Sequence, residues 1–262
     1  MTGLIVKVEK VDNSMVELDN VSFAYDKNTL VVNNISFKIK DGEAVGIIGA
    51  NGCGKSTLLK LICGLLTGDG KIRIDGITVT KNSLPDVRSR VGLIFQDSDN
   101  QIFMPTVYDE IAFGLRNMGL NTEKVENRVT EVLDRLDINQ LKYKHTYNLS
   151  GGEKRMVCIA SVLAMHPDVV LMDEPSIALD PCNRRNVINK LRSMHETKII
   201  ASHDLDMIYE TCERVIVVKN HSVVADDRTD RVLSDERLLV ECGLELPLFM
   251  QSCRAYNGFD KD

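Results

Sequence analysis

One nine-residue stretch contains the residue types that bind phosphate. It runs Gly49-Ala50-Asn51-Gly52-Cys53-Gly54-Lys55-Ser56-Thr57 and matches the pattern GxxxxGK[ST]. Glycine lets the backbone approach a phosphate closely because it has no Cβ, and the free N–H groups at a helix N-terminus point toward the anion. Lys55 adds a positive charge near the terminal phosphates, and the Ser56 hydroxyl is suited to Mg²⁺. The stretch therefore predicts a nucleotide site.

Two adjacent carboxylates follow an apolar run later in the chain. Val169 to Met172 is wholly apolar, and Asp173 and Glu174 come directly after it. A buried strand ending this way would place the first acid near Mg²⁺ and the second where it could polarise a water molecule. Solvated acids at a strand end would also explain the pair taken alone. Beside a phosphate loop, the pair favours nucleotide hydrolysis.

A second helix start has an unusual composition. Ser150-Gly151-Gly152-Glu153 has the form of a capping box, which explains the serine and the glutamate. It does not explain two glycines in the first turn, because glycine lowers helix propensity. Glycines at that place would let a phosphate approach the helix N-terminus. The chain therefore predicts two helix ends that bind phosphate.

The flanking patterns predict the elements that position these residues. Apolar runs predict strands, and the spacing of the longer segments predicts helices. An Asp75-Gly76 turn between alternating runs predicts an antiparallel hairpin over 71–80. The expected strands lie at 15–18, 21–25, 35–40, 43–48, 91–95, 169–174, 198–202, 215–218 and 223–225. The expected helices lie at 58–63, 106–117, 122–136 and 154–165, with a mostly helical tail from 229 to 247.

Composition limits the classes of function. The length of 262 residues suits one large domain or two small ones, and the net charge of −6 argues against a nucleic-acid surface. No apolar run is long enough to span a bilayer. The seven cysteines have no CxxC spacing, which disfavours a zinc site. We expect reduced, cytosolic thiols, each buried as a small hydrophobic side chain.

The order of these motifs resembles the ATPase subunit of ABC transporters over nearly the whole chain from Met15. The resemblance rests on Gly49–Thr57, Gln96, Leu149–Glu153, Val169–Glu174, Ala178-Leu179-Asp180 and His203. It implies a P-loop NTPase fold of the α/β class: a mixed sheet core, an antiparallel β subdomain and a helical subdomain insert. The implied boundaries are an N-terminal extension over 1–14, an ATPase domain over 15–228 with its insert at about 97–165, and a tail over 229–262.

The resemblance also implies roles for individual residues. Tyr25 would stack on adenine, and Gly49, Ala50, Asn51, Gly52, Cys53, Gly54, Lys55, Ser56 and Thr57 would bind ATP. Ser56, Gln96 and Asp173 would form the Mg²⁺ site. Glu174 would be the general base, with Gln96 and the switch residue His203 completing the catalytic set. Leu149, Ser150, Gly151, Gly152 and Glu153 would form the signature that meets ATP held by an opposing subunit, and Asp180 would belong to the D-loop.

A narrower resemblance points to the energy-coupling-factor branch, which imports cobalt, nickel or vitamins. It rests on segments 95–103, 105–107 and 109–114, on Gly151–Arg155, and on Gly243–Pro247. Glu153 stands where most family members have glutamine, and Ser98 stands where proline is common in this branch. The apolar side chains Ile102, Phe103 and Met104 would either pack on the following helix or form a groove for a short helix of the membrane subunit.

The implied partners are a second ABC ATPase subunit, identical or different, a transmembrane coupling subunit and a substrate-binding membrane subunit, with no nucleic acid. The implied location is the cytoplasmic face of the cell membrane. One alternative is a soluble ABC ATPase that acts on nucleic acid or ribosomes. Another is a regulatory module without hydrolysis, which the presence of Glu174 and His203 disfavours. The sequence leaves the transported substrate open.

Overall fold

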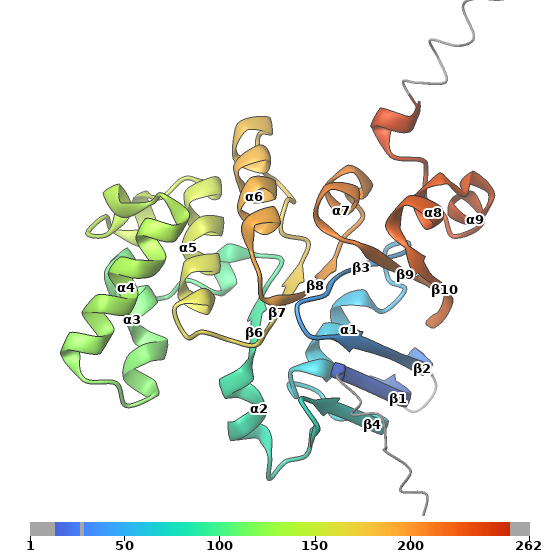
Figure 1. The fold of residues 1–262 in the computed structure, drawn as a ribbon, viewed down its shortest axis with the longest axis horizontal. Coiled ribbons are helices and arrows are strands. Elements are labelled where there is room, and N and C mark those ends of the chain that lie inside the picture. The colour runs from blue at the N-terminus through green and yellow to red at the C-terminus, as the bar shows by residue number, and fades with distance from the viewer. Residues whose placement is uncertain (1–13, 27–28, 252–262) are drawn as a thin grey trace, which may run out of the picture.

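Two β-sheets and a helical lobe make up the molecule (Figure 1). The computed structural model describes residues 14–26 and 29–251 of the chain. Residues 1–13 of the expected N-terminal extension lie outside them, as does Cys253.

The larger sheet has six strands in the order β10-β9-β3-β8-β7-β6. Their bounds are β3 Ala44–Ile48, β6 Val91–Ile94, β7 Val169–Asp173, β8 Thr197–Ala201, β9 Arg214–Lys219 and β10 Ser222–Arg228. Five neighbouring strands run parallel, and β10 pairs antiparallel with β9. Every residue of β3, β7 and β8 is buried, as expected for parallel strands covered on both faces. The mixed sheet and its closing hairpin are as the sequence predicts.

The smaller sheet is antiparallel, with the order β2-β1-β4-β5. Its strands are β1 Ser14–Ala24, β2 Leu30–Lys40, β4 Asp69–Ile74 and β5 Ile77–Thr78. The turn residues Asp75 and Gly76 both have positive φ, which suits the predicted hairpin. The two strand pieces expected at 15–18 and 21–25 belong to one continuous strand. Its register shifts between Leu18 and Val21, where Asn20 takes φ 51° as in a bulge.

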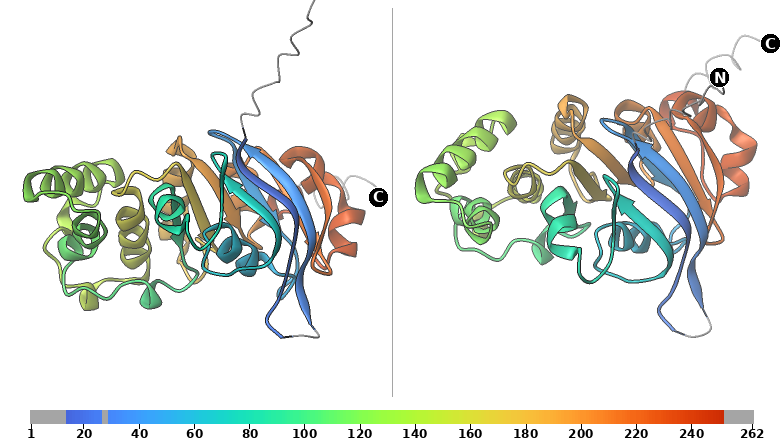
Figure 2. Two further views of the ribbon diagram at one scale, coloured as in Figure 1. Left: turned by 90° about the horizontal axis from the view of Figure 1, so that it is seen from below. Right: turned by 60° about the horizontal axis from the view of Figure 1, so that its bottom comes forward.

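Three longer helices form a lobe beside the parallel sheet, and Figure 2 shows it standing away from the antiparallel sheet. They are α3 Val107–Asn117, α4 Thr122–Leu136 and α5 Gly151–Leu163. Thr106 and Asn121 cap α3 and α4 with side-chain acceptors, and α4 buries its predicted apolar face. The expected start of α5 at Lys154 is three residues late. The Ser150–Glu153 capping box is complete, so the helix begins at Gly151.

The remaining helices cover the parallel sheet. They are α1 Lys55–Ile62, α2 Leu84–Arg90, α6 Pro181–Ser193, α7 Leu205–Thr211, α8 Thr229–Ser234 and α9 Glu236–Glu241. Short 3-10 turns lie at Ser98–Asn100, Asn139–Leu141 and Thr146–Asn148. Leu233, Leu239 and Leu246 belong to the same buried cluster as the helical lobe. The described part of the tail is therefore packed onto the body of the molecule.

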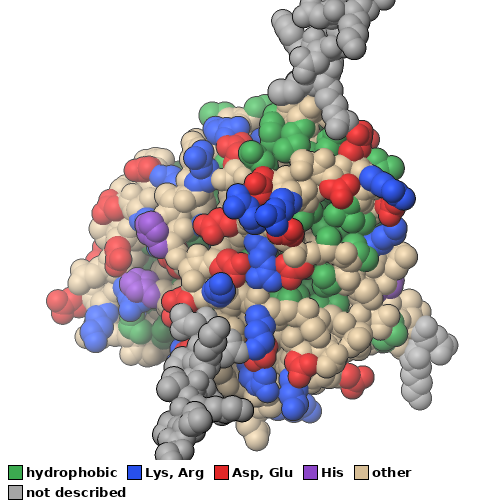
Figure 3. Space-filling model, turned by 45° about the vertical axis from the view of Figure 1, so that its right-hand side comes forward, with side chains coloured by type: hydrophobic (Ala, Val, Ile, Leu, Met, Phe, Trp, Pro, Cys, Tyr) green, Lys and Arg blue, Asp and Glu red, His purple; other side chains and the backbone are tan. Residues whose placement is uncertain are grey.

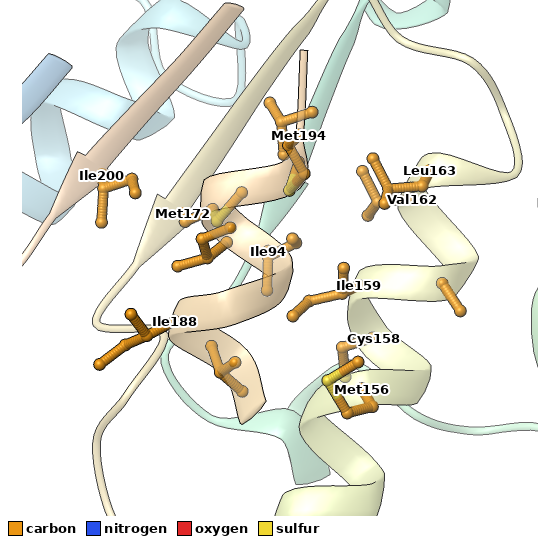
Figure 4. Packing of buried hydrophobic residues seen from close by; sticks show 14 of the residues in the cluster. Ile94, Met156, Cys158, Ile159, Val162, Leu163, Met172, Ile188, Met194 and Ile200 are labelled. Carbon is orange, nitrogen blue, oxygen red and sulfur yellow. The ribbon is translucent and has the colours of Figure 1, made fainter. Parts of the chain in front are cut away.

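The helical lobe and the sheet share one hydrophobic core. Figure 4 shows Met156 and Ile159 of α5 beside Ile94 of β6, Met172 of β7 and Ile188 of α6. All five side chains are buried and belong to one cluster. Because close-packed interiors transmit displacements, a movement of the sheet can displace the helical lobe as well.

Five of the six described cysteines are buried, and Cys182 is exposed. The expectation that each cysteine is a buried hydrophobic side chain is therefore wrong for Cys182, which lies in the solvent-exposed first turn of α6. Burial raises the pKa of the Cys158 thiol to about 11 and that of the Cys212 thiol to about 12. These two thiols are packing residues.

Candidate active site

The carboxyl ends of four neighbouring parallel strands meet at one edge of the larger sheet. The phosphate loop follows β3, and Gln96 follows β6. Asp173 ends β7 with Glu174 directly after it, and His203 follows β8. A pocket of about 420 Å³ opens there, lined by Lys55, Ser56, Gln96, Glu174 and His203 among others. Ligands bind at this edge in open α/β sheets. The fold therefore brings together residues that lie up to 148 positions apart, from Lys55 to His203.

The phosphate loop has the backbone geometry that its glycines permit. Gly49 has φ 153°, and a Cβ there would lie 2.2 Å from the Val218 oxygen. Gly54, at φ 109°, would place a Cβ 2.2 Å from the Val31 oxygen. Any other residue at either position would clash with main chain. Lys55 Nζ donates to the Gly49 oxygen at 2.7 Å and the Ala50 oxygen at 3.3 Å, so the ammonium stays within the loop.

Ser56 and Asp173 form the oxygen-rich corner of the pocket. Ser56 Oγ donates to Asp173 Oδ1 at 3.0 Å. Burial raises the pKa of Asp173, with Glu174 adding to the rise, while the Ser56 hydrogen bond and the charges of Lys60 and Lys55 oppose it. Mg²⁺ is typically bound by one or two protein oxygens together with phosphates and water. A hydroxyl beside a carboxylate, with the Gln96 amide in the same pocket, fits that ion.

Glu174 is fixed from several directions. Its side chain is buried, and its backbone takes φ 47°, a conformation that residues other than glycine seldom adopt. Ser202 Oγ donates to Oε2 at 2.8 Å. The His203 main-chain N–H donates to Oε1 at 3.1 Å, and His203 Nδ1 donates to the same oxygen at 2.8 Å. The carboxylate is therefore held in one orientation at the wall of the pocket.

Tyr25 lies at the outer side of the loop. Its ring is 60% exposed and packs edge-on against Phe23 at 4.9 Å. Its hydroxyl is 3.2 Å from Oγ1 of Thr57, which is the last residue of the phosphate-loop motif. An exposed aromatic face tethered to the loop is available for a planar ring.

The signature residues lie apart from this pocket. Leu149 is buried, whereas Ser150 and Gly151 are exposed at the start of α5. Glu153 completes the capping box by accepting from the Ser150 N–H at 2.7 Å, and Lys144 Nζ contacts both of its oxygens at 2.9 Å. Burial favours a higher pKa for Glu153, but Lys144 and the Ser150 N–H outweigh it and lower the pKa. The first turn of this helix is thus capped by side chains of the subunit itself.

The two signature glycines have different surroundings. A Cβ at Gly152 would lie 2.2 Å from the Asn183 side chain on α6, whereas a Cβ at Gly151 would meet open space. Asn183 follows Asp180, which caps α6 through the Cys182 and Asn183 N–H groups at 3.0 Å. Gly152 is therefore explained in part by contact with α6 within the subunit. Of these two glycines, Gly151 is the one at which no contact with the described residues requires the absence of a Cβ.

Three residues at the site are absent from the sequence-based set. Ser202 orients Glu174, and Arg155 donates to the main-chain oxygens of Phe95 and Gln96. Arg184 forms a two-point ion pair with Asp204, with distances of 2.7 and 2.6 Å. The position of Ser202 between an apolar strand and His203 is a usable signal for the first. Arg155 falls in the Gly151–Arg155 segment of the narrower resemblance, but its contacts have no local signal, because its partners lie 59 and 60 residues away. Arg184 has no sequence signal, because its partner lies 20 residues away.

Comparisons with known proteins agree with this geometry. A family model described as ABC transporter matches residues 32–177. A Geobacter sulfurreducens protein, provisionally named an ABC transporter ATP-binding protein, is 46% identical over 93% of this chain and 98% of its own length. A Clostridium acetobutylicum protein with the same provisional name is 43% identical over 88% of this chain and 100% of its own.

Solved structures are similar over most of the chain. CbiO1 of Clostridium perfringens, described as part of the ABC transporter complex cbiONQ, has a TM-score of 0.79 at 33% identity and covers 88% of this chain and 94% of its own. The cassette MJ0796, solved as a dimer bound to ADP and Pi, has a TM-score of 0.74 at 27% identity over 82% of this chain and 99% of its own.

The fold and the site define a P-loop ABC ATPase cassette, and this chain belongs to the ABC transporter family. Within the family it is an ATP-binding subunit of a transporter, an ATP hydrolase. Such cassettes bind ATP, generally with Mg²⁺, and act as dimers with transmembrane partners. In the part of the chain that the structure describes, no helix has the length and apolar character needed to cross a bilayer.

Proposed function

We propose that this chain is the motor of an energy-coupling-factor-type importer that takes up cobalt, nickel or a vitamin. The similarity to CbiO1, a subunit of cbiONQ by its description, supports this branch. The segments 95–114 and 243–247 support it as well. The ATPase subunit need not touch the transported substrate. The class of substrate therefore depends on the membrane partners and not on this site.

The chemistry we propose uses the residues already placed at the pocket. The loop N–H groups and Lys55 hold the phosphates, and Glu174 accepts the proton of the attacking water. Ser202 and His203 orient Glu174 through the contacts described above. Mg²⁺, when held by Ser56, Asp173 and Gln96, would neutralise charge on the terminal phosphates. The observation that supports this assignment is the joint position of Lys55, Glu174 and His203 around one pocket.

The membrane partner would dock on an aromatic pair at the edge of the helical lobe. Phe103 is 63% exposed and meets Phe113 of α3 edge-on, with ring centroids 4.8 Å apart. Ile102 packs against the core, which supports the packing alternative for that residue, and we propose the docking alternative for Phe103. The buried Glu110 carboxylate accepts from the Phe103 N–H at 3.0 Å and the Met104 N–H at 2.8 Å. Phe103 is therefore displayed from a fixed backbone.

This docking proposal is tested by Phe103→Ser in the complete importer. We expect the purified subunit to keep its thermal stability and ATPase activity, because the side chain is mostly exposed. Co-purification with the membrane component and substrate uptake should be lost. Val224→Ser, at a side chain 47% exposed on β10, is the matched control and should change neither co-purification nor substrate uptake. Equal loss of stability and ATPase activity in Phe103→Ser would show that the side chain only packs.

We place the subunit at the cytoplasmic face of the cell membrane, held there by its partners. The alternative of an ATPase acting on nucleic acid would need a basic surface. On the face shown in Figure 3, acidic and basic side chains are intermixed. Arg214, for example, pairs with both Glu43 and Asp226. Purification from membranes together with integral subunits would favour the importer, and recovery with ribosomes or DNA would favour the alternative.

A further inference from the structure

Arg155 connects the helix that begins at the signature with the loop that carries Gln96. It is the fifth residue of α5 and is 3% exposed. One terminal nitrogen donates to the Phe95 oxygen at 2.6 Å, and the other donates to the Gln96 oxygen. The planar guanidinium thus holds two successive carbonyls at the point where β6 gives way to the loop, a contact that a lysine could not reproduce.

This arrangement is costly for a residue that only fills space. Among the described residues, no carboxylate forms an ion pair with Arg155, and its Nε has no hydrogen-bond partner. Burial lowers the pKa of the guanidinium, and Asp97 and Asp173 offset this only in part. An apolar side chain of similar volume would avoid the cost of burying a charge. The two main-chain hydrogen bonds are therefore the reason that the described part of the structure gives for arginine at this position.

Further contacts join the same two segments. Lys154 pairs with Asp99, and Gln101 Nε2 donates to the Cys158 oxygen at 3.5 Å. Gln101 also accepts from the Phe95 N–H at 3.0 Å, which closes the loop on itself. The first two turns of α5 and residues 95–101 are thus tied at successive points. A displacement of one would move the other.

The start of α5 and the 95–101 loop, joined by these contacts, face different parts of the molecule. Gly151 and Gly152 lie one turn before Arg155 at the exposed N-terminus of α5, and Gln96 lines the nucleotide pocket with Glu174. An α-helix is stiff over one turn, so a shift at its N-terminus reaches Arg155 undiminished.

We propose that Arg155 is a positioning residue that couples the N-terminus of α5 to Gln96. Contact at the signature would then adjust the position of Gln96 in the pocket of the same subunit. The proposal rests on the proposed function and on the pairing that the family resemblance implies, in which that helix end meets the nucleotide of a second subunit. It assigns a role to a side chain that touches neither nucleotide.

The first test measures hydrogen exchange of the 95–101 backbone amides. In Arg155→Met we expect these amides to exchange about tenfold faster, because two anchoring contacts are lost. Arg128→Met is the matched control, since Arg128 also donates to a main-chain oxygen, that of Ala164, but at the far end of α5. Unchanged protection of 95–101 in Arg155→Met would overturn the proposal. If that variant does not fold, Arg155→Lys keeps the charge, loses the two-point contact and should show the same faster exchange.

The second test is a double-mutant cycle on ATP hydrolysis. Arg155→Met and Gln96→Ala should each lower kcat about tenfold with little change in KM, and the double variant should be no worse than the poorer single one. A purely structural role would instead make the two losses multiply, which would overturn the proposal. If Gln96→Ala leaves kcat unchanged, the catalytic role of Gln96 fails, and the exchange measurement alone decides on Arg155.

Discussion

Glu174 shows how closely one side chain is specified at this site. It combines burial, a left-handed backbone and contacts from Ser202 and His203. Strained residues of this kind persist only where their surroundings hold them. The strain and the contacts together fix the direction of the carboxylate, which a general base requires before its proton affinity matters.

We expect Glu174→Gln to retain ATP binding and to lower the hydrolysis rate by about 100-fold or more, because the base is lost while the phosphate loop is unchanged. Lys55→Ala should instead weaken ATP binding, since it removes the charge that contacts the phosphates. Equilibrium nucleotide binding and steady-state hydrolysis, measured on the same preparations, separate the two effects. Wild-type hydrolysis by the glutamine variant would show that Glu174 is not the base.

A pH effect should follow from Asp204. Burial favours a higher pKa, but Arg184, the Met207 N–H and the Ser176 hydroxyl outweigh it and lower the pKa of this carboxyl. Because the pKa of Asp204 is lowered in the folded state, its ionised carboxyl stabilises the fold at pH values above the ordinary pKa of 3.8. This contribution is lost as the pH falls through the folded-state pKa. Asp204→Asn should therefore cost about 2 kcal/mol of unfolding free energy at pH 7 and less near pH 3.

Urea unfolding at both pH values measures this difference. Asp235→Asn offers a comparison, since Asp235 also caps a helix, accepting from the Leu238 N–H at 3.0 Å, but forms no ion pair with an arginine among the described residues. An Asp204→Asn penalty that is the same at pH 3 and pH 7 would contradict the assignment.

At the scale of elements, the helical lobe depends on buried polar contacts made by α3. Glu110 is 5% exposed and binds the backbone that displays Phe103. Thr146 adds a hydrogen bond to the Met104 oxygen at 2.6 Å from the loop before α5. The loop after Gln96 is therefore held from both α3 and the approach to α5.

Glu110→Gln should lower the unfolding free energy by about 1 to 2 kcal/mol, because an amide accepts more weakly and brings donors that the site does not satisfy. Denaturant unfolding checks the size of this loss, and hydrogen exchange of residues 103–104 should increase. Glu123→Gln, at an exposed position in the first turn of α4, is the control and should be neutral. Equal stability of the two variants would contradict a clamping role for Glu110.

For the whole molecule, the separation of the signature from the nucleotide pocket is the central feature. Ser150 and Gly151 are exposed, and neither lines the pocket that contains Lys55. Asn183 of α6 lies against Gly152, so the starts of α5 and α6 face the same surface. A second cassette placed head to tail by a two-fold axis would bring this surface to the opposite nucleotide.

Cys182 offers a direct probe of that assembly, because it is exposed in the first turn of α6. In a Glu174→Gln, Cys253→Ser background, alkylation of Cys182 should be slower with ATP than with ADP as the dimer closes over it. Light scattering should report a dimer with ATP and monomers with ADP. This arrangement would be ruled out if the protein is monomeric with both nucleotides and Cys182 is alkylated at the same rate with each. The same measurements should be repeated with a candidate partner cassette.

Local sequence determined most of the site residues and the elements that bear them. Glycines at 49, 52 and 54 are needed by the loop itself, and all three have positive φ in the structure. Capping residues and apolar periodicity act within a few positions, so the helices at 107–117 and 122–136 were predictable. The strand register was not predictable, because pairing with the distant strand β2 joins the two expected pieces into one strand, with a register shift between Leu18 and Val21.

Tertiary structure alone decided which groups meet. Ser202 reaches Glu174 from 28 residues away, and Arg155 reaches the carbonyl before Gln96 from 60 residues away. Nothing local in the sequence requires either contact, because each depends on the order of β6, β7 and β8 in the sheet. Packing also showed that Gly152 touches α6 and that Cys182 faces solvent. Short-range chemistry was thus set by the sequence, and the long-range positioning of that chemistry was set by the fold.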